Sequence, residues 1–130
     1  MVAITEKQFE SVLRQSNPNS ISIWMPTHPA GQDTQQDPIR LKNLLSRAEE
    51  LMVQDGARTS EARDRAEKIR QAVGNGDFWR HRSLGLGLLS GNGDTRTLSV
   101  PVWVPEIVTV SEHFHVKPLF GLWRQDQPFY

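Results

Sequence analysis

Apolar and polar residues alternate over residues 20–25, where the chain reads Ser-Ile-Ser-Ile-Trp-Met. In a strand, Ile21, Ile23 and Met25 would point to one side, and Trp24 would point to the other with the two serines. The pattern therefore predicts a strand with one face in the core and a second face that is partly covered. Alternation of the same kind predicts three further strands, at 84–88, 98–104 and 107–110.

Helical spacing of apolar residues marks the segment between the first two strands. Asp37, followed by a proline, has the signature of a helix start with its carboxylate as N-cap. Gly56 is the expected stop of this helix. A second helix is predicted over 61–73, capped by Thr59 or Ser60. The core-facing positions expected in the two helices are Leu41, Leu44, Leu45, Ala48, Leu51, Met52, Ala62, Ala66, Ile69 and Val73.

Turn and end signals complete the expected order of elements. Residues 91–94 (Gly-Asn-Gly-Asp) indicate a hairpin between the second and third strands. Pro101 places the third strand at a sheet edge or a bulge, because proline lacks a donor for the ladder. A short first helix with a capping box of Thr5 and Gln8, and a last helix from Pro118, are also predicted.

Together these elements predict an α+β fold for residues 1–130, with a mostly antiparallel sheet of about four strands and helices packed on it, in a single domain. The strand–helix–helix–strand connection could add one parallel pair. Phe129 and Tyr130 follow a turn and resemble the start of another strand. We therefore expect the chain to be cut from a longer protein with further domains.

Composition narrows the classes of function. The sequence has no cysteine, which excludes disulfides, thiolate catalysis and cysteine-based zinc sites. It has no apolar run long enough to span a membrane and no secretory pattern, so a cytoplasmic location without a membrane partner is expected. The formal net charge is +0, so wholesale electrostatic binding to nucleic acid is not indicated, and no DNA partner is expected.

Histidines offer one kind of candidate chemistry. A small ligand-binding or metal-binding enzyme domain that uses His28, His81 and His115 in a cleft is one alternative. Partly buried, hydrogen-bonded histidines are the commoner use of this residue. The sequence shows no phosphate-loop or nucleophile-elbow pattern, and we assign no catalytic residue and no cofactor.

Basic residues offer a second kind of candidate chemistry. Residues 40–82 carry ten Lys and Arg against seven Asp and Glu. Arg58, Arg80 and Arg82, with Trp79 beside the last two, suit contacts to RNA phosphates and bases. The competing interpretation is a solvated helix face with intrahelical ion pairs.

Four segments carry a resemblance to a known family. In chain order they are residues 22–28, 36–45, 78–89 and 114–123, the last beginning Phe-His-Val-Lys-Pro. Together they resemble the N-terminal domain of the bacterial relatives of archaeo-eukaryotic peptide-chain release factors. The element order is similar to that of the N-domain of the eukaryotic class I termination factor, in which a strand precedes two helices and a strand pair. In that relative, the N-domain reads the stop codon in the ribosomal A site.

The sequence departs from the family at the motifs that perform its chemistry. The helix–helix connection, 54–60, reads Gln-Asp-Gly-Ala-Arg-Thr-Ser, where the relative has its stop-reading Asn-Ile-Lys-Ser loop. Of the Tyr-x-Cys-x-x-x-Phe motif, only Phe114 matches. Gly-Gly-Gln, which in the relative promotes peptidyl-tRNA hydrolysis, does not occur. The resemblance therefore implies a recognition domain without stop-codon decoding or hydrolysis.

We expect, on this resemblance, a non-catalytic domain that helps a larger protein dock on the ribosome or its RNA in termination, rescue or stress. The candidate RNA contacts are Arg58, Arg80 and Arg82, with His28 and Gln32 in the polar loop 28–36 as a second surface. A protein-interaction module unrelated to ribosomes is the first alternative, and the histidine-based enzyme domain is the second.

Overall fold

The computed structural model describes Lys7 and residues 20–74, 76–80, 83–91, 95–111 and 114. Apart from Lys7, the predicted first helix lies outside these residues. The predicted last helix, most of the predicted turn at 91–94, and Phe129-Tyr130 also lie outside them. The described elements, in chain order, are β1 (Ser20–Pro26), η1 (Gln32–Gln35), α2 (Gln36–Gln54), α3 (Thr59–Val73), α4 (Gly76–Arg80), β2 (Gly85–Ser90), β3 (Thr95–Val100) and β4 (Ile107–Ser111).

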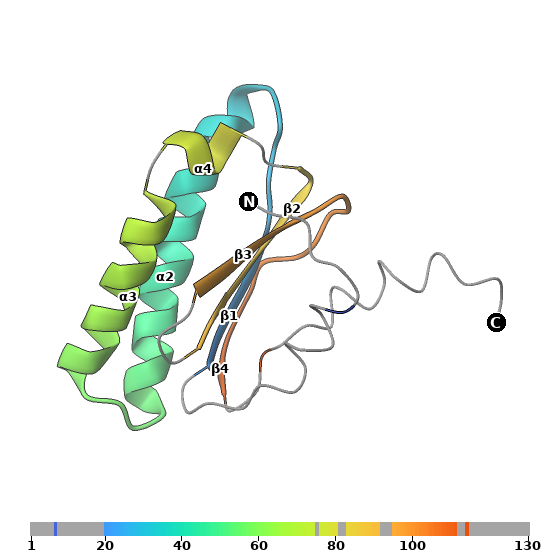
Figure 1. Cartoon of the computed structure of the whole chain (residues 1–130). Helices are drawn as coiled ribbons and strands as arrows, with labels where there is room; N and C mark the ends of the chain where they lie inside the picture. The colour runs from blue at the N-terminus through green and yellow to red at the C-terminus, as the bar shows by residue number, and fades with distance from the viewer. Residues whose placement is uncertain are drawn as a thin grey trace, which may run out of the picture.

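The four strands form one sheet in the order β3-β2-β1-β4 (Figure 1). Every pair is antiparallel: Ile23 lies opposite Leu88 of β2 and opposite Val108 of β4, and β3 pairs with the outer side of β2. The predicted α+β fold is therefore confirmed, and the additional parallel pair is wrong. Two long helices return the chain to the end of the sheet where β1 finished, so β2 must run in the opposite direction.

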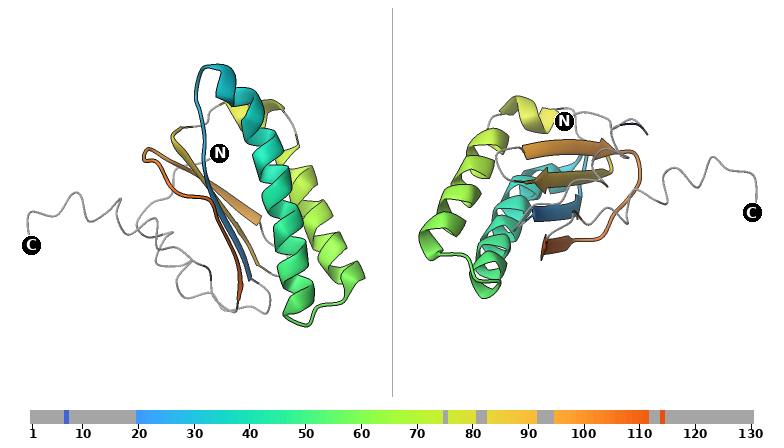
Figure 2. Two further views of the ribbon diagram at one scale, coloured as in Figure 1. Left: turned by 180° about the vertical axis from the view of Figure 1, so that it is seen from behind. Right: turned by 60° about the horizontal axis from the view of Figure 1, so that its bottom comes forward.

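Helices α2 and α3 lie side by side on one face of the sheet (Figures 1 and 2). Ile21, Ile23 and Met25 of β1 point into this layer and are fully buried, as predicted. The inward residues of both helices meet them because they recur on one stripe of each helix. The other buried residues of this core are Leu41, Leu45, Ala48, Met52, Ala62, Ile69, Val73, Phe78, Leu86 and Leu88. None of the described helices is long and apolar enough to cross a membrane.

The predicted stop at Gly56 is confirmed. Gly56 has a φ of 106°, in the left-handed region that favours glycine. Its N–H donates to the Val53 carbonyl at 3.1 Å, and the N–H of Ala57 donates to the Met52 carbonyl at 2.9 Å. These two bonds are those of a Schellman motif, and Ala57 also packs against the core. The motif turns the chain sharply from α2 into α3.

The predicted cap of α3 is wrong. Thr59 and Ser60 already belong to the helix, and Arg58 occupies the N-cap position with no side-chain cap bond. The inward face of α3 follows the prediction, because it is set by periodicity rather than by the cap. On the outer side, Arg70 joins the two helices through an ion pair of 3.3 Å with Glu49.

Trp24 organises the second face of the sheet. It is fully buried and packs in a cluster with Leu89, Leu98, Val100 and Val104. Trp24 pairs across the ladder with Gly87 of β2. A Cβ on Gly87 would lie 2.8 Å from Trp24 Cη2, so the indole ring fits only over a glycine.

The third strand ends earlier than predicted. β3 stops at Val100, and the chain from Pro101 leaves the sheet, because proline cannot extend the ladder. It crosses the second face against Gly85, where an added Cβ would meet the Val102 carbonyl oxygen at 2.7 Å. The predicted edge position is confirmed, since β3 is the outermost strand on its side.

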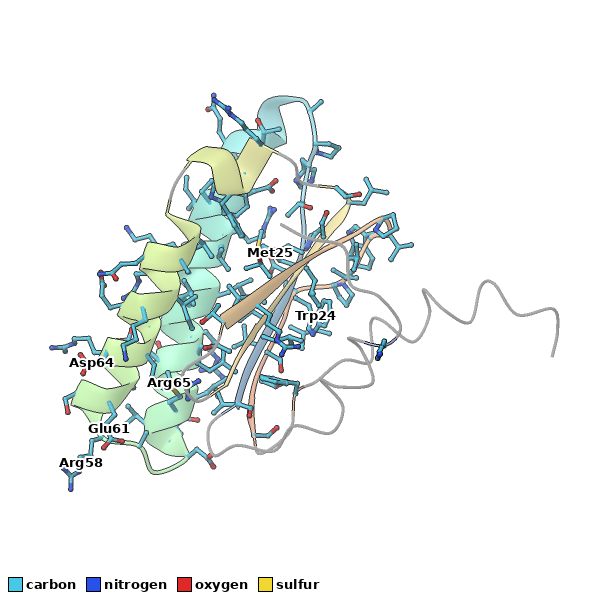
Figure 3. The ribbon with its side chains drawn as sticks, viewed as in Figure 1. Trp24, Met25, Arg58, Glu61, Asp64 and Arg65 are labelled. Carbon is cyan, nitrogen blue, oxygen red and sulfur yellow. The ribbon has the colours of Figure 1, made fainter. Side chains whose placement is uncertain are left out.

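The Arg65 side chain links α3 to the end of β2 by hydrogen bonds (Figure 3). Its Nη2 donates to the carbonyl oxygens of Ser90 at 2.9 Å and Gly91 at 3.2 Å. Burial lowers the pKa of the Arg65 guanidinium from its usual value, because desolvation disfavours the charged form. The guanidinium stays charged at neutral pH because the unperturbed value is so high.

Replacing Gly87 with Ala should destabilise the fold by about 2 kcal/mol, since the added methyl group overlaps the ring of Trp24. In a Trp24→Leu background the same change should be neutral, or stabilising by about 0.5–1 kcal/mol, because alanine is favoured over glycine in a strand. Urea unfolding of the wild type, Gly87→Ala, Trp24→Leu and the double variant measures the effect of Gly87→Ala on stability in both backgrounds. An equal cost in both backgrounds would contradict the steric explanation.

Arg65→Met should lower the free energy of unfolding by about 1–3 kcal/mol, because two carbonyl oxygens lose a charged donor. Arg63→Met is the matched control: Arg63 is exposed on the same helix, and its replacement should change stability by less than about 0.5 kcal/mol. Thermal unfolding of both variants tests the difference. Similar melting temperatures for the two would show that the Arg65 bonds contribute nothing.

Candidate functional site

The candidate RNA contacts fall at opposite ends of the helix layer. Arg58 is exposed in the α2–α3 connection, which we call the hairpin tip (Figure 3). Arg80 is exposed at the end of α4, at the other end of the layer beside η1 (Figure 1). The 15 residues of α3 separate the two, a length of about 22 Å. The arginines therefore do not form one basic patch.

His28 lies at the same end as Arg80. The segment after β1 is joined to the segment after α4, because Thr27 donates from its N–H to the Leu84 carbonyl at 3.0 Å and from its hydroxyl to the Ser83 carbonyl at 2.7 Å. We call this region, built from the β1–α2 loop and α4, the loop end. Gln32 begins η1 there. The side chain of Gln32 and the whole of Arg82 lie outside the described part of the chain.

A buried carboxylate holds the loop end together. Asp37 is fully buried, and its Oδ2 accepts a hydrogen bond of 2.8 Å from the backbone N–H of His28. Its Oδ1 lies 2.8 Å from His28 Nδ1. Because a carboxylate can only accept, His28 Nδ1 is the donor in this contact. Asp37 thus fixes both the backbone and the ring of His28.

The predicted N-cap role of Asp37 is wrong. The helix α2 begins one residue before it, with Gln35 at the N-cap and no side-chain cap bond, because η1 leads directly into the first turn. Asp37 sits in that turn, where a negative charge is favoured by the helix dipole. Its carboxylate reaches back to the loop, where it contacts the backbone and the ring of His28.

Arg40 extends this contact to a third segment. Its Nη1 lies 3.4 Å from Asp37 Oδ1, and its Nε lies 2.8 Å from Glu106 Oε1. Glu106 belongs to the connection between β3 and β4. A single network of His28, Asp37, Arg40 and Glu106 therefore ties together the β1–α2 loop, α2 and that connection. The spacing of Asp37 and Arg40 was visible in the sequence, but nothing in it pointed to Glu106.

Among the described residues, α2 lines two pockets, each with a volume of about 260 Å³. The polar pocket lies between α2 and the β3–β4 connection, and Arg40 and Glu106 form part of its wall. The apolar pocket lies between α2, α3 and α4, with Trp79 as one wall. The Trp79 ring stands edge-on to the buried Phe78 ring, with centroids 4.9 Å apart, which fixes its orientation. No local pattern in the sequence indicates either pocket.

The described residues contain no group of three His, Asp or Glu side chains that could hold a metal ion. His81 and His115 lie outside those residues, and His28 is engaged by Asp37. The histidine-based alternative therefore stays an untested prediction. The sequence matches no protein-family model and no curated protein. The resemblance to release-factor relatives accordingly rests on the residues that carry it.

Asp37→Ala should lower the free energy of unfolding by about 2–3 kcal/mol, because the His28 N–H and Arg40 lose a buried acceptor. Asp55→Ala is the matched control, since Asp55 is exposed at the other end of the same helix and its removal should cost less than about 0.5 kcal/mol. Urea unfolding measures both. Equal losses of stability would show that the network does not hold the loop.

Proposed function

We propose that this chain is a non-catalytic recognition domain of a release-factor-like protein, which contacts RNA when the protein docks on the ribosome in termination, rescue or stress. The observation that carries the proposal is the hairpin tip, where exposed Arg58 lies between two antiparallel helices. The resemblance places the nucleic-acid-reading loop of the relative at this connection. The order of a strand, a helix pair and a strand pair also supports the proposal.

The hairpin tip presents a fixed backbone with a long cationic side chain. The Arg58 carbonyl accepts the N–H of Ala62 at 3.0 Å, so the backbone is part of the first helical turn. The guanidinium suits a phosphate oxygen, because it offers several donors in one plane. Glu61 lies in this first turn, and Asp64 lies further along the same helix (Figure 3). Their negative charges limit the tip to few phosphate contacts.

The loop end offers a second contact region. Arg80 and His28 lie there, and the 19 residues of α2 separate this end from the tip, a distance of about 28 Å. Two small contacts on one rigid layer would recognise the shape of a folded RNA rather than a sequence. The formal net charge of +0 accords with contacts at defined points instead of a general basic field.

One observation favours a second candidate function, a protein-interaction module unrelated to ribosomes. Trp103 is 67% exposed, although Val104 beside it is only 2% exposed. A tryptophan held outward by a buried neighbour has the character of an interface anchor. If the chain is such a module, Trp103→Ala would abolish capture of a partner protein. Charge reversal at Arg58, Arg80 and Arg82 would leave that capture intact.

The proposed function is tested by co-sedimentation with ribosomes over a salt series. We expect binding that weakens as salt rises, with a shallow slope of about one to three released ions, since few phosphates are contacted. Arg58→Glu should weaken binding, and so should Arg80→Glu combined with Arg82→Glu. Because the two ends are far apart, testing them separately shows which end contacts RNA.

Arg47→Glu combined with Arg96→Glu is the matched control, as both residues lie away from the two ends, in the middle of α2 and near the start of β3. This pair makes the same change of charge as the double reversal at Arg80 and Arg82, and twice the change made by Arg58→Glu, and it should leave binding nearly unchanged. If all the reversals, including the control, weakened binding equally, the contact would be a general charge effect. Unchanged binding with all three candidate arginines reversed would refute the proposal.

A further inference from the structure

The polar pocket has the dimensions and chemistry of a site for one flat heterocycle. Its volume of about 260 Å³ lies just below the range of roughly 300–1,000 Å³ in which drug-sized ligands bind. Ile39 and Leu44 supply apolar surface, and Ile39 is 52% exposed although it is a large aliphatic residue. The remaining wall is formed by Gln36, Arg40, Asn43 and Glu106.

Arg40 provides a planar surface that is already fixed in place. Its Nη1 is held by buried Asp37 at 3.4 Å, and its Nε is held by Glu106 at 2.8 Å. Two carboxylates bound to different nitrogens of the guanidinium restrain the plane of the whole group. Unpaired bases stack on guanidinium planes, and a restrained plane loses little conformational entropy when a base stacks on it.

The amides of Gln36 and Asn43 provide neutral donors and acceptors. They lie seven residues apart on one side of α2 and therefore about 10.5 Å apart along its axis. Both residues are exposed, and within the described part of the chain neither amide group is hydrogen-bonded to another group. Amide side chains read base edges, because each offers a donor and an acceptor at adjacent atoms.

The charges of the pocket favour a neutral group over a phosphate. Arg40 stands between the carboxylates of Asp37 and Glu106, which offset its charge. An anion would meet two negative groups for one positive group. A base brings no charge and can also donate an exocyclic amine to Glu106, as bases do to acidic side chains.

On these grounds, and on the RNA contact of the proposed function, we infer that the polar pocket binds a single unpaired nucleobase of RNA. The base stacks on Arg40 and exposes its edge to Gln36 and Asn43. The pocket adjoins the loop end through Asp37, which contacts both Arg40 and His28. The phosphate of the same nucleotide therefore lies outside the pocket, toward solvent.

The test follows the side-chain amide signals of Gln36 and Asn43 and the Nε–H signal of Arg40 by NMR during titration. The probes are the four ribonucleoside monophosphates and single-stranded tetraribonucleotides of each base. We expect these three signals to shift on titration with at least one base. A tetranucleotide should bind more tightly than its monophosphate, because neighbouring phosphates contact the loop end.

Gln36→Ala combined with Asn43→Ala should weaken oligonucleotide binding roughly tenfold, the loss expected for a good base contact. Both residues are exposed, so the variant should fold normally. Gln54→Ala is the matched control, because Gln54 is an exposed amide residue at the far end of the same helix. It should leave the affinity unchanged.

The outcomes separate this inference from the proposed function. RNA that shifts only signals near Arg58 or Arg80, with Gln36 and Asn43 unmoved, overturns the nucleobase site and leaves ribosome docking in place. Shifts in the polar pocket with a peptide but with no oligonucleotide also overturn it, and indicate a protein partner. Failure of both the titration and ribosome co-sedimentation overturns the two proposals together.

Discussion

The antiparallel pairing of β1 with β2 holds the rest of the structure in place. It joins Ile21 to Ser90 and Pro26 to Gly85, residues that lie 69 and 59 positions apart in the sequence. The long connection costs conformational entropy, which grows only slowly with loop length. Both strands are almost entirely buried, so the pairing is stabilised by apolar packing on two faces. It determines where the helices enclose the core and where Trp24 meets Gly87.

The same pairing creates the loop end, because it places the end of β1 beside the start of β2. Thr27 then reaches Ser83 and Leu84, and the β1–α2 loop can lie only over the first turn of α2. A carboxylate buried at this point would be costly without partners. Asp37 has His28 and Arg40, and this requirement gives the loop one geometry. The loop end is therefore a formed surface, with the polar pocket at its side.

The fixed positions of the hairpin tip and the loop end suit the proposed docking on RNA. The hairpin tip and the loop end are held at opposite ends of α2 and α3, which pack on one core. A partner that meets both ends must match their separation, so shape would contribute to specificity beside charge. Trp103 lies outside this arrangement, and a partner protein would give it a separate use.

The sequence by itself determined the features that depend on neighbouring residues. The inward residues of β1, α2 and α3, the stop at Gly56 and the edge position implied by Pro101 follow from periodicity and backbone restrictions, which are local. Much of the candidate site depends instead on how segments distant in the sequence are arranged in space. Arg58 and Arg80 are only 22 positions apart, yet the straight helix α3 separates them.

Only the tertiary structure decided which segments meet. The direction of β2 relative to β1 depended on how many helices cross between them, and the need for glycine at Gly87 depended on a ring more than sixty residues away. Asp37 looked like an N-cap because its neighbours suit one, but burial beneath His28 gave its carboxylate stronger partners. Glu106 meets Arg40 because the fold places the β3–β4 connection beside α2. Contacts between distant segments are formed by packing, and local sequence patterns do not specify them.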